Sequence, residues 1–194
     1  MLSSSDARNL VIEKYNNNHM ERLTHIFGVA EMAEELALKY DVDPEKALIA
    51  AYMHDYSKYD DPAVAIGVFT DEEINECRRY PFLFHAYMSA YKYKEFAKDD
   101  FDIDIYNAIR NHVFGRVGMS DLEEIVMISD YTEKNRKYPT CIECRKILLA
   151  GNKDLAIYKA LSYTIDHAVK KGEEAHPEQI KVREIYRKKL GLWI

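Results

Sequence analysis

Apolar residues recur at intervals of three and four positions along most of the chain, which is the spacing of an amphipathic α-helix. The clearest case is the segment from about 19 to 39, where Ile26, Val29, Ala33 and Leu36 fall on one face. Alternation of apolar and polar residues never continues long enough to indicate a β-strand. The pattern therefore predicts an all-α fold.

Capping signals and helix breakers divide this pattern into successive helices. Ser5-Asp6 is interpreted as the N-cap of a first helix that ends near 16–18, and Ser120 as the N-cap of a later helix. The stretch 56–69 interrupts the pattern with Asp-Pro and Gly and is predicted to be a loop. Other helices are expected over about 46–55, 70–80, 82–98, 103–113, 138–150, 154–171 and 177–189.

Composition agrees with long helices in one globular unit. The chain has 194 residues, of which 47% are hydrophobic and 31% charged, and only 7 are Gly and 5 are Pro. This length suits one domain with a sizeable core, and no linker, repeat or low-complexity segment divides it. We therefore expect a single domain over residues 1–194.

Net charge and hydropathy argue against several kinds of partner, and cysteine usage indicates a location. A formal net charge of −6 argues against binding a nucleic acid polymer or an anionic membrane, although metal ions could still attract a polyanionic small molecule. No apolar run reaches the ~20 residues of a membrane span. Three cysteines and no signal-peptide pattern indicate a reducing, cytoplasmic location. Cys141 and Cys144 form one CxxC without further ligands nearby, so we interpret them as packing residues.

Six polar residues carry most of the chemical information. They offer four imidazoles and two carboxylates, a ligand set suited to borderline divalent metals. Asp55 follows an apolar helix that should be buried, where a carboxylate is costly without a cation or hydrogen bonds. Unrelated polar residues on separate helices are the alternative, and a structural zinc site is disfavoured because no cysteine is among the ligands. The six residues are His25, His54, Asp55, His85, His112 and Asp130.

The order of these residues resembles the HD superfamily of metal-dependent phosphohydrolases: a first His, a His-Asp pair, two further histidines and a late Asp. The neighbouring residues resemble the YqeK-type bis(5′-nucleosyl)-tetraphosphatases (symmetrical) over about residues 8–190. One departure is Val113-Phe114, which follows His112 where the family usually has His-Thr before the glycine. The segments that carry the resemblance are Arg22-Leu-Thr-His25, His54-Asp55-Tyr-Ser-Lys58, His112-Val-Phe-Gly115 and Ser129-Asp130-Tyr-Thr-Glu133-Lys-Asn-Arg136.

The resemblance implies an HD-domain helical bundle with its metal site in the bundle core. One metal would be held by His25, His54, Asp55 and Asp130, and a second by His85 and His112 with Asp55 shared. Iron is the expected metal, as one or two ions, and manganese could replace it. Asp55 would then act as a bridging ligand that positions a metal-bound hydroxide. The implied reaction splits diadenosine tetraphosphate, or a related dinucleoside polyphosphate, symmetrically into two ADP.

The resemblance also implies substrate contacts. Lys58 would have a catalytic role at a phosphate, or else be a surface lysine. Arg136 would contact phosphate or ribose, or else form a helix pair with Glu133, which lies midway between it and Asp130. Arg22 would face the same site, and the metal residues His85 and His112 would also touch substrate. His176, in the segment 172–177, would lie beside the nucleotide base.

Two other functions remain open from the sequence. One is another HD-family nucleotide phosphohydrolase, such as a nucleotidase or a deoxynucleotide triphosphohydrolase. The other is a non-catalytic nucleotide-binding sensor, which the complete ligand set disfavours. A cyclic-dinucleotide phosphodiesterase is disfavoured because no Gly-Tyr-Pro follows the motifs. For the assembly, we consider a homodimer.

Overall fold

The computed structural model describes residues 2–192, and over this range it contains only helices, with no strand. This confirms the all-α prediction. Two segments are 3₁₀ helices, η1 (Pro62–Ala65) and η2 (Lys98–Asp100). The α-helices are α1 (Ser4–Tyr15), α2 (Met20–Lys39), α3 (Pro44–Met53), α4 (Asp71–Arg79), α5 (Leu83–Ala97), α6 (Ile103–Asn111), α7 (Asp121–Thr132), α8 (Pro139–Leu149), α9 (Lys153–Lys170) and α10 (Pro177–Lys189).

Local capping explains where several helices begin. Ser120 caps α7 as predicted, because its side chain accepts the backbone N–H of Glu123 while the Glu123 carboxylate accepts the backbone N–H of Ser120. The prediction of Ser5-Asp6 as the first N-cap is wrong. Ser3 caps α1, and Asp6 is instead the third helical residue, whose carboxylate completes a capping box with Ser3.

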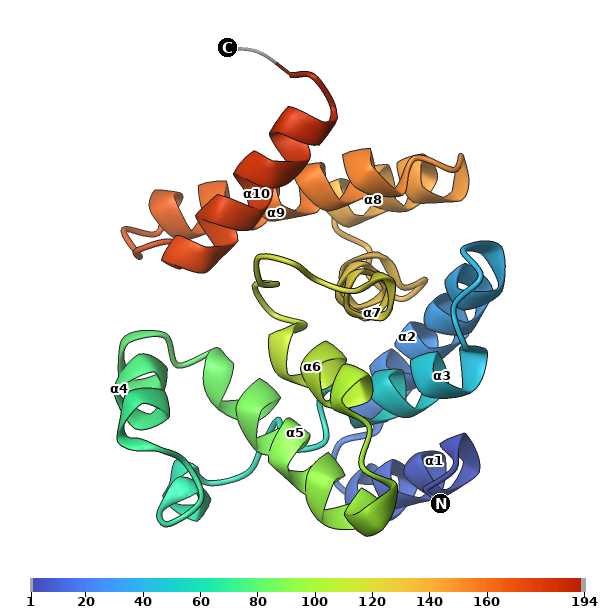
Figure 1. Cartoon of the computed structure of the whole chain (residues 1–194), viewed down its shortest axis with the longest axis vertical. Coiled ribbons are helices and arrows are strands. Elements are labelled where there is room, and N and C mark those ends of the chain that lie inside the picture. Colours follow the sequence, from blue (N-terminus) through green and yellow to red (C-terminus); the bar gives the residue numbers. More distant parts are fainter. Residues whose placement is uncertain (1, 193–194) are drawn as a thin grey trace.

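Helix α7 lies at the centre of the molecule, viewed nearly end-on in Figure 1. On one side are α8, α9 and α10, and on the other are α2, α3 and α6, with α1, α4 and α5 further out (Figure 1). Its apolar residues Leu122, Ile125, Val126 and Ile128 are at most 2% exposed. A helix that is apolar on several faces is stable only when neighbours cover it, and α7 packs against α2, α3, α6, α8 and α9.

Two predicted helices end earlier than expected, and this places two candidate ligands at helix ends. Helix α3 ends at Met53 rather than near 55, and α6 ends at Asn111 rather than 113. His54 and His112 are therefore the C-cap residues of these two helices. The loop predicted over 56–69 is confirmed except for η1 within it.

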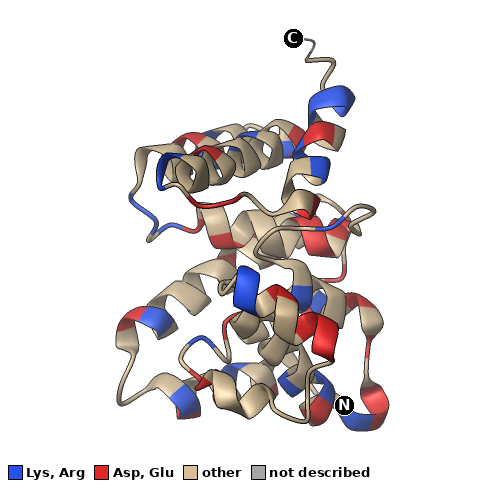
Figure 2. Ribbon diagram, turned by 90° about the vertical axis from the view of Figure 1, so that its left-hand side faces the viewer, with Lys and Arg blue, Asp and Glu red and all other residues tan. Residues whose placement is uncertain are grey.

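Positions of Lys and Arg are interspersed with those of Asp and Glu along the ribbon in Figure 2, without a face of single sign in that view. In the described part of the chain, no helix combines the length and the apolar character that crossing a membrane requires. Cys141 and Cys144 are buried in α8 as free thiols, in agreement with a packing role.

Candidate metal centre

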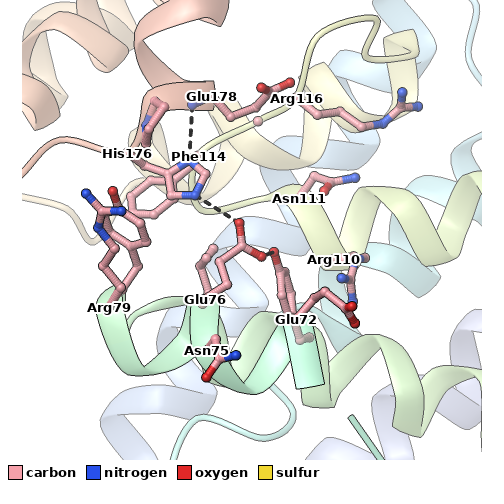
Figure 3. Close-up of a pocket in the computed structure, with 15 residues that line it drawn as sticks. Glu72, Asn75, Glu76, Arg79, Arg110, Asn111, Phe114, Arg116, His176 and Glu178 are labelled. Atoms are coloured by element: carbon pink, nitrogen blue, oxygen red, sulfur yellow. Dashed lines mark hydrogen bonds and ion pairs between the residues drawn. The ribbon is translucent and has the colours of Figure 1, made fainter. Parts of the chain in front are cut away.

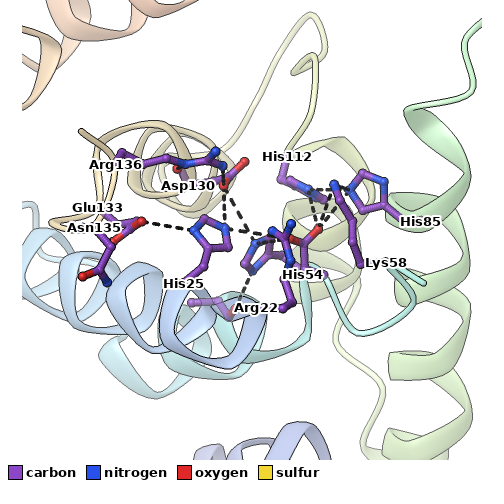
Figure 4. A network of polar contacts seen from close by, with 12 residues as sticks. Arg22, His25, His54, Lys58, His85, His112, Asp130, Glu133, Asn135 and Arg136 are labelled. Atoms are coloured by element: carbon purple, nitrogen blue, oxygen red, sulfur yellow. Dashed lines mark hydrogen bonds and ion pairs between the residues drawn. The ribbon is translucent and has the colours of Figure 1, made fainter. Parts of the chain in front are cut away.

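The structure brings the six predicted ligands into one buried cluster around Asp55 (Figure 4). The Asp55 carboxylate faces four imidazoles, and its side chain is 3% exposed. Its Oδ1 lies 3.0 Å from His85 Nε2 and 3.9 Å from His112 Nε2. Its Oδ2 lies 3.4 Å from His54 Nε2 and 3.8 Å from His25 Nε2. These residues are therefore not unrelated polar side chains on separate helices.

Asp130 on α7 approaches the same cluster from the other side. Its Oδ1 lies 3.0 Å from His25 Nε2 and 4.0 Å from His54 Nε2. Together with the Asp55 contacts, this surrounds the His25 and His54 Nε2 atoms with carboxylate oxygens. The ligands come from helix α2, the ends of α3 and α6, helix α5 and helix α7, so only the packed bundle assembles them.

The unsatisfied atoms of the cluster fit a divalent cation. His25 Nε2, His54 Nε2 and Asp55 Oδ1 are buried and make no hydrogen bond. An unpaired buried polar atom costs free energy, and a metal ion would supply the missing partner. Ligand atoms lie within 4.8 Å of one another in three overlapping groups: His25, His54 and Asp55; His54, His112 and Asp130; and Asp55, His85 and His112.

His54 and His112 turn their Nε2 atoms into the cluster because their Nδ1 atoms have other partners. His54 Nδ1 lies 2.6 Å from the carbonyl oxygen of Ala51, and His112 Nδ1 lies 2.7 Å from that of Ile109. Carbonyls in the last turn of a helix lack an intrahelical donor, so an imidazole just past the helix end can donate to them. Such a bond fixes the tautomer that leaves the Nε2 lone pair free for a metal.

Three basic residues surround the cluster and contact its carboxylates. Arg22 Nη1 donates to Asp55 Oδ2 at 2.6 Å, and Arg136 Nη2 donates to Asp130 Oδ1 at 2.8 Å. Lys58 Nζ lies 3.5 Å from Asp55 Oδ1 and 3.1 Å from His85 Nε2. Lys58 and Arg136 are only half-buried, so part of each remains available to a ligand.

Mutual contacts set the protonation states of the cluster. Burial would raise the pKa of Asp55, but His54 and His85 hold it well below its usual range. Burial likewise opposes ionisation of Asp130, yet His25 and Arg136 keep its pKa well below the usual range. For His112, burial and the neighbouring imidazoles lower the pKa to about 3. Anionic carboxylates and a neutral imidazole at pH 7 are the forms that bind metals.

The alternative considered for Arg136, a helix pair with Glu133, does not form. Helix α7 ends at Thr132, so Glu133 leaves the helix and turns toward α2 (Figure 4). There its Oε1 lies 3.2 Å from His25 Nδ1. Sequence reasoning therefore missed Glu133 as a neighbour of the site, although a carboxylate three residues after Asp130 was a visible signal.

His176 lies outside the metal cluster, in a separate pocket of about 660 Å³ (Figure 3). It caps α10, its Nε2 lies 3.1 Å from Glu76 Oε1, and its ring stacks on Phe114 with centroids 4.9 Å apart. Tyr80 meets the same imidazole edge-on at 4.5 Å. No metal residue lines this pocket, but Asn111, which precedes His112, does.

The fold and the cluster define a class: an all-helical protein whose packed helices hold a buried site for divalent metal. Residues 22–135 match the HD domain family, which is more than half of the chain. The chain therefore belongs to the HD domain family.

Several proteins of similar length are similar to this chain in sequence or in structure. A Bacillus subtilis (strain 168) protein named "Bis(5'-nucleosyl)-tetraphosphatase, symmetrical" is 34% identical over 159 residues, covering 81% of this chain and 84% of that protein. A protein of the same name from Halalkalibacterium halodurans is 34% identical over 164 residues, covering 82% and 85%. The crystal structure of a predicted HD superfamily hydrolase involved in NAD metabolism from Clostridium acetobutylicum superposes with a TM-score of 0.82 at 29% identity, covering 97% and 99%. These likenesses confirm the HD-type helical fold.

Proposed function

We propose that this protein is a metal-dependent hydrolase that splits diadenosine tetraphosphate, and related dinucleoside polyphosphates, symmetrically into two ADP. The observation that carries the proposal is the Asp55-centred cluster, found in a chain similar over most of its length to proteins named for this activity. We infer one or two divalent ions, with iron expected and manganese able to replace it. We also propose that residues 1–194 act as one domain, because one core cluster includes both Ala7 and Tyr186.

The charge balance of the site supports a polyanionic substrate. Without metal, three carboxylates are matched by three permanent cations, so the cluster is close to neutral when its histidines are neutral. Divalent ions would make the cluster strongly positive within a chain of net charge −6. A phosphate chain is a ligand that such a local field attracts. The charged groups are Asp55, Asp130, Glu133, Arg22, Lys58 and Arg136.

The bound metal and Asp55 have separate roles in this proposal. Bound metal would offset charge on the phosphoryl oxygens and lower the pKa of water so that it can attack near neutral pH. Asp55 presents one oxygen to His25 and His54 and the other to His85 and His112, the arrangement that a shared ligand requires.

The basic residues would act on the phosphate chain. Lys58 and Arg136 are half-buried beside the ligands, where they would orient phosphate oxygens and stabilise charge that develops during transfer. Arg22 is more deeply buried and already donates to Asp55, so its main effect is to hold that carboxylate in place.

The pocket at His176 would accept one nucleoside of the substrate. Its volume of about 660 Å³ is in the range of small-molecule sites, and its aromatic rings can stack on a base. Phe114 stands where the resembled family usually has a smaller polar residue, and its ring adds to the stack with His176. The pocket adjoins the end of α6, next to His112, so a base there lies on the His85–His112 side of the cluster.

A product assay tests the proposal. Protein stripped with a chelator and reloaded with Fe²⁺ or Mn²⁺ should convert diadenosine tetraphosphate to ADP alone. Lys58→Ala should lose about 10- to 100-fold in kcat/KM, the value of one charge-assisted hydrogen bond. Lys14→Ala is the matched control, because Lys14 pairs with Asp60 at 2.6 Å rather than with the cluster.

The other functions predict different products. Release of nucleosides or triphosphate would indicate another HD-family phosphohydrolase, and tight nucleotide binding with no turnover in either metal would indicate a sensor. A homodimer stays a prediction, which sedimentation of the metal-loaded protein can check.

A further inference from the structure

His25 lies within a helix, whereas His54 and His112 lie at helix ends. It lies within the long helix α2, where backbone carbonyls already accept intrahelical N–H groups. His54 and His112 instead sit at helix ends and use the free carbonyls of Ala51 and Ile109. An imidazole in the middle of a helix must find its second partner on another element. For His25 that partner is Glu133, whose Oε1 lies 3.2 Å from Nδ1.

Several contacts fix Glu133 in place. It is 1% exposed, and its second oxygen, Oε2, accepts the backbone N–H of Asn135 at 2.6 Å. The Arg145 guanidinium on α8 donates to the carbonyl oxygens of Thr132, Glu133 and Arg136, which holds the turn after α7. A buried carboxylate held in this way is a rigid acceptor for the imidazole.

Gly28 makes room for this carboxylate. It lies one turn after His25 on α2 and faces Glu133. A Cβ atom at this position would lie 2.9 Å from Asn135 Nδ2 and 3.1 Å from Glu133 Cδ, and closer still to Glu133 Oε2. Glycine inside a helix is unfavourable relative to alanine. Close approach of the Glu133 carboxylate gives this glycine a physical reason.

We propose that Glu133 is a positioning residue for the metal centre. By accepting the Nδ1 proton of His25, it fixes the tautomer and ring orientation that present Nε2 to the metal, and Gly28 is the position that allows this contact. The inference rests on the proposed function only in that the cluster binds a divalent metal. Outer partners of this kind typically change metal affinity 10- to 100-fold when removed.

Metal affinity of the full chain tests the proposal without any activity measurement. Chelator-stripped protein is titrated with Mn²⁺ alone. Glu133→Ala and Gly28→Ala should each weaken binding about 10- to 100-fold, because one removes the acceptor and the other displaces it. The double variant should bind about as well as Glu133→Ala alone, since both changes act on one contact. Alanine at position 28 favours the helix by propensity, and thermal unfolding of the metal-free variant shows whether its close contacts with Glu133 and Asn135 offset that gain.

Glu31→Ala is the matched control. Glu31 also lies on α2 and pairs with Lys134, so this variant loosens the same two segments without touching His25. It should bind Mn²⁺ as the wild type does. Thermal unfolding of every metal-free variant shows which ones are folded.

Proton NMR of the Zn²⁺-loaded protein gives a readout that general loosening would not produce. Glu133→Ala should shift or remove one imidazole N–H signal, that of His25, and retain those of His54 and His112, which donate to backbone carbonyls. Unchanged affinity and an unchanged imidazole spectrum in Glu133→Ala would overturn the proposal. So would a Gly28→Ala effect that persists in full in the Glu133→Ala background. A wild type that binds no Mn²⁺ would overturn the proposed function itself.

Discussion

Asp55→Asn is the most informative single change, because Asn keeps the shape of the side chain and removes its charge. Asp55 is the residue around which the cluster converges, with Arg22 Nη1 at 2.6 Å and His85 Nε2 at 3.0 Å. The change acts on two separate quantities. One is the stability of the metal-free protein, and the other is the extra stability that bound metal supplies.

Both magnitudes follow from these contacts. Hydrogen bonds to a charged partner contribute about 1.5–3 kcal/mol and neutral ones about 0.5–1.5 kcal/mol, so the metal-free variant should lose about 1–2 kcal/mol. In the wild type, metal at 100 times its Kd should add about 2.7 kcal/mol. For a chain of this size, that corresponds to a rise in Tm of about 5–11 °C. The variant should show almost none of this rise, because its shared ligand has lost its charge.

The assay is thermal unfolding of chelator-treated protein with and without Mn²⁺. Asp60→Asn is the matched control: Asp60 lies five residues later and pairs with Lys14 at 2.6 Å, outside the cluster. The control should keep the full metal-dependent rise in Tm. If Asp55→Asn also kept it, the metal would bind elsewhere and the proposed centre would be refuted.

Two further predictions concern the structure around the site. Lys46 and the backbone of α6 hold the pKa of Asp102 below its usual value despite burial, so its ionised form stabilises the fold above about pH 4. Asp102→Asn retains the helix cap and should therefore lower the free energy of unfolding by about 0.5 kcal/mol near pH 6. Urea unfolding should show that the difference from the wild type shrinks below pH 4. A difference that grew on acidification would contradict this prediction. Gly115 has φ +69° and a Cβ there would lie 3.0 Å from Met119 Sδ, so Gly115→Ala should cost about 1–2 kcal/mol or more. Gly67 has φ +77° and open space around an added Cβ, so Gly67→Ala measures the backbone cost alone. An equal fall in Tm for the two variants would show that crowding against Met119 adds nothing at Gly115.

Most helices and all six candidate ligands could be predicted from the sequence, for different reasons. Periodic burial and capping residues act locally, so Ser120 was informative without tertiary context. The ligands were found because their order along the chain is distinctive, and the structure brings them together as a cluster. Errors arose at helix ends, such as the first N-cap, where neighbouring serines offer several similar caps.

Contacts between distant elements were not accessible in the same way. A helix pair between Glu133 and Arg136 stayed open as an alternative, because nothing local indicated that α7 ends at Thr132. His176 was expected at the nucleotide base, and its pocket forms only where the start of α10 meets Phe114 and α4.

By itself, the sequence determined that this chain is helical, acidic and equipped with four imidazoles and two carboxylates in a characteristic order. Only the tertiary structure decided that these groups converge in three overlapping sets, within each of which the ligand atoms lie within 4.8 Å of one another, and that Glu133 lies beside His25. The physical reason is the separation along the chain of the residues that interact. Helical periodicity and capping depend on residues three or four positions apart, whereas the distance between His25 and Glu133 depends on how two helices pack across 108 residues of chain.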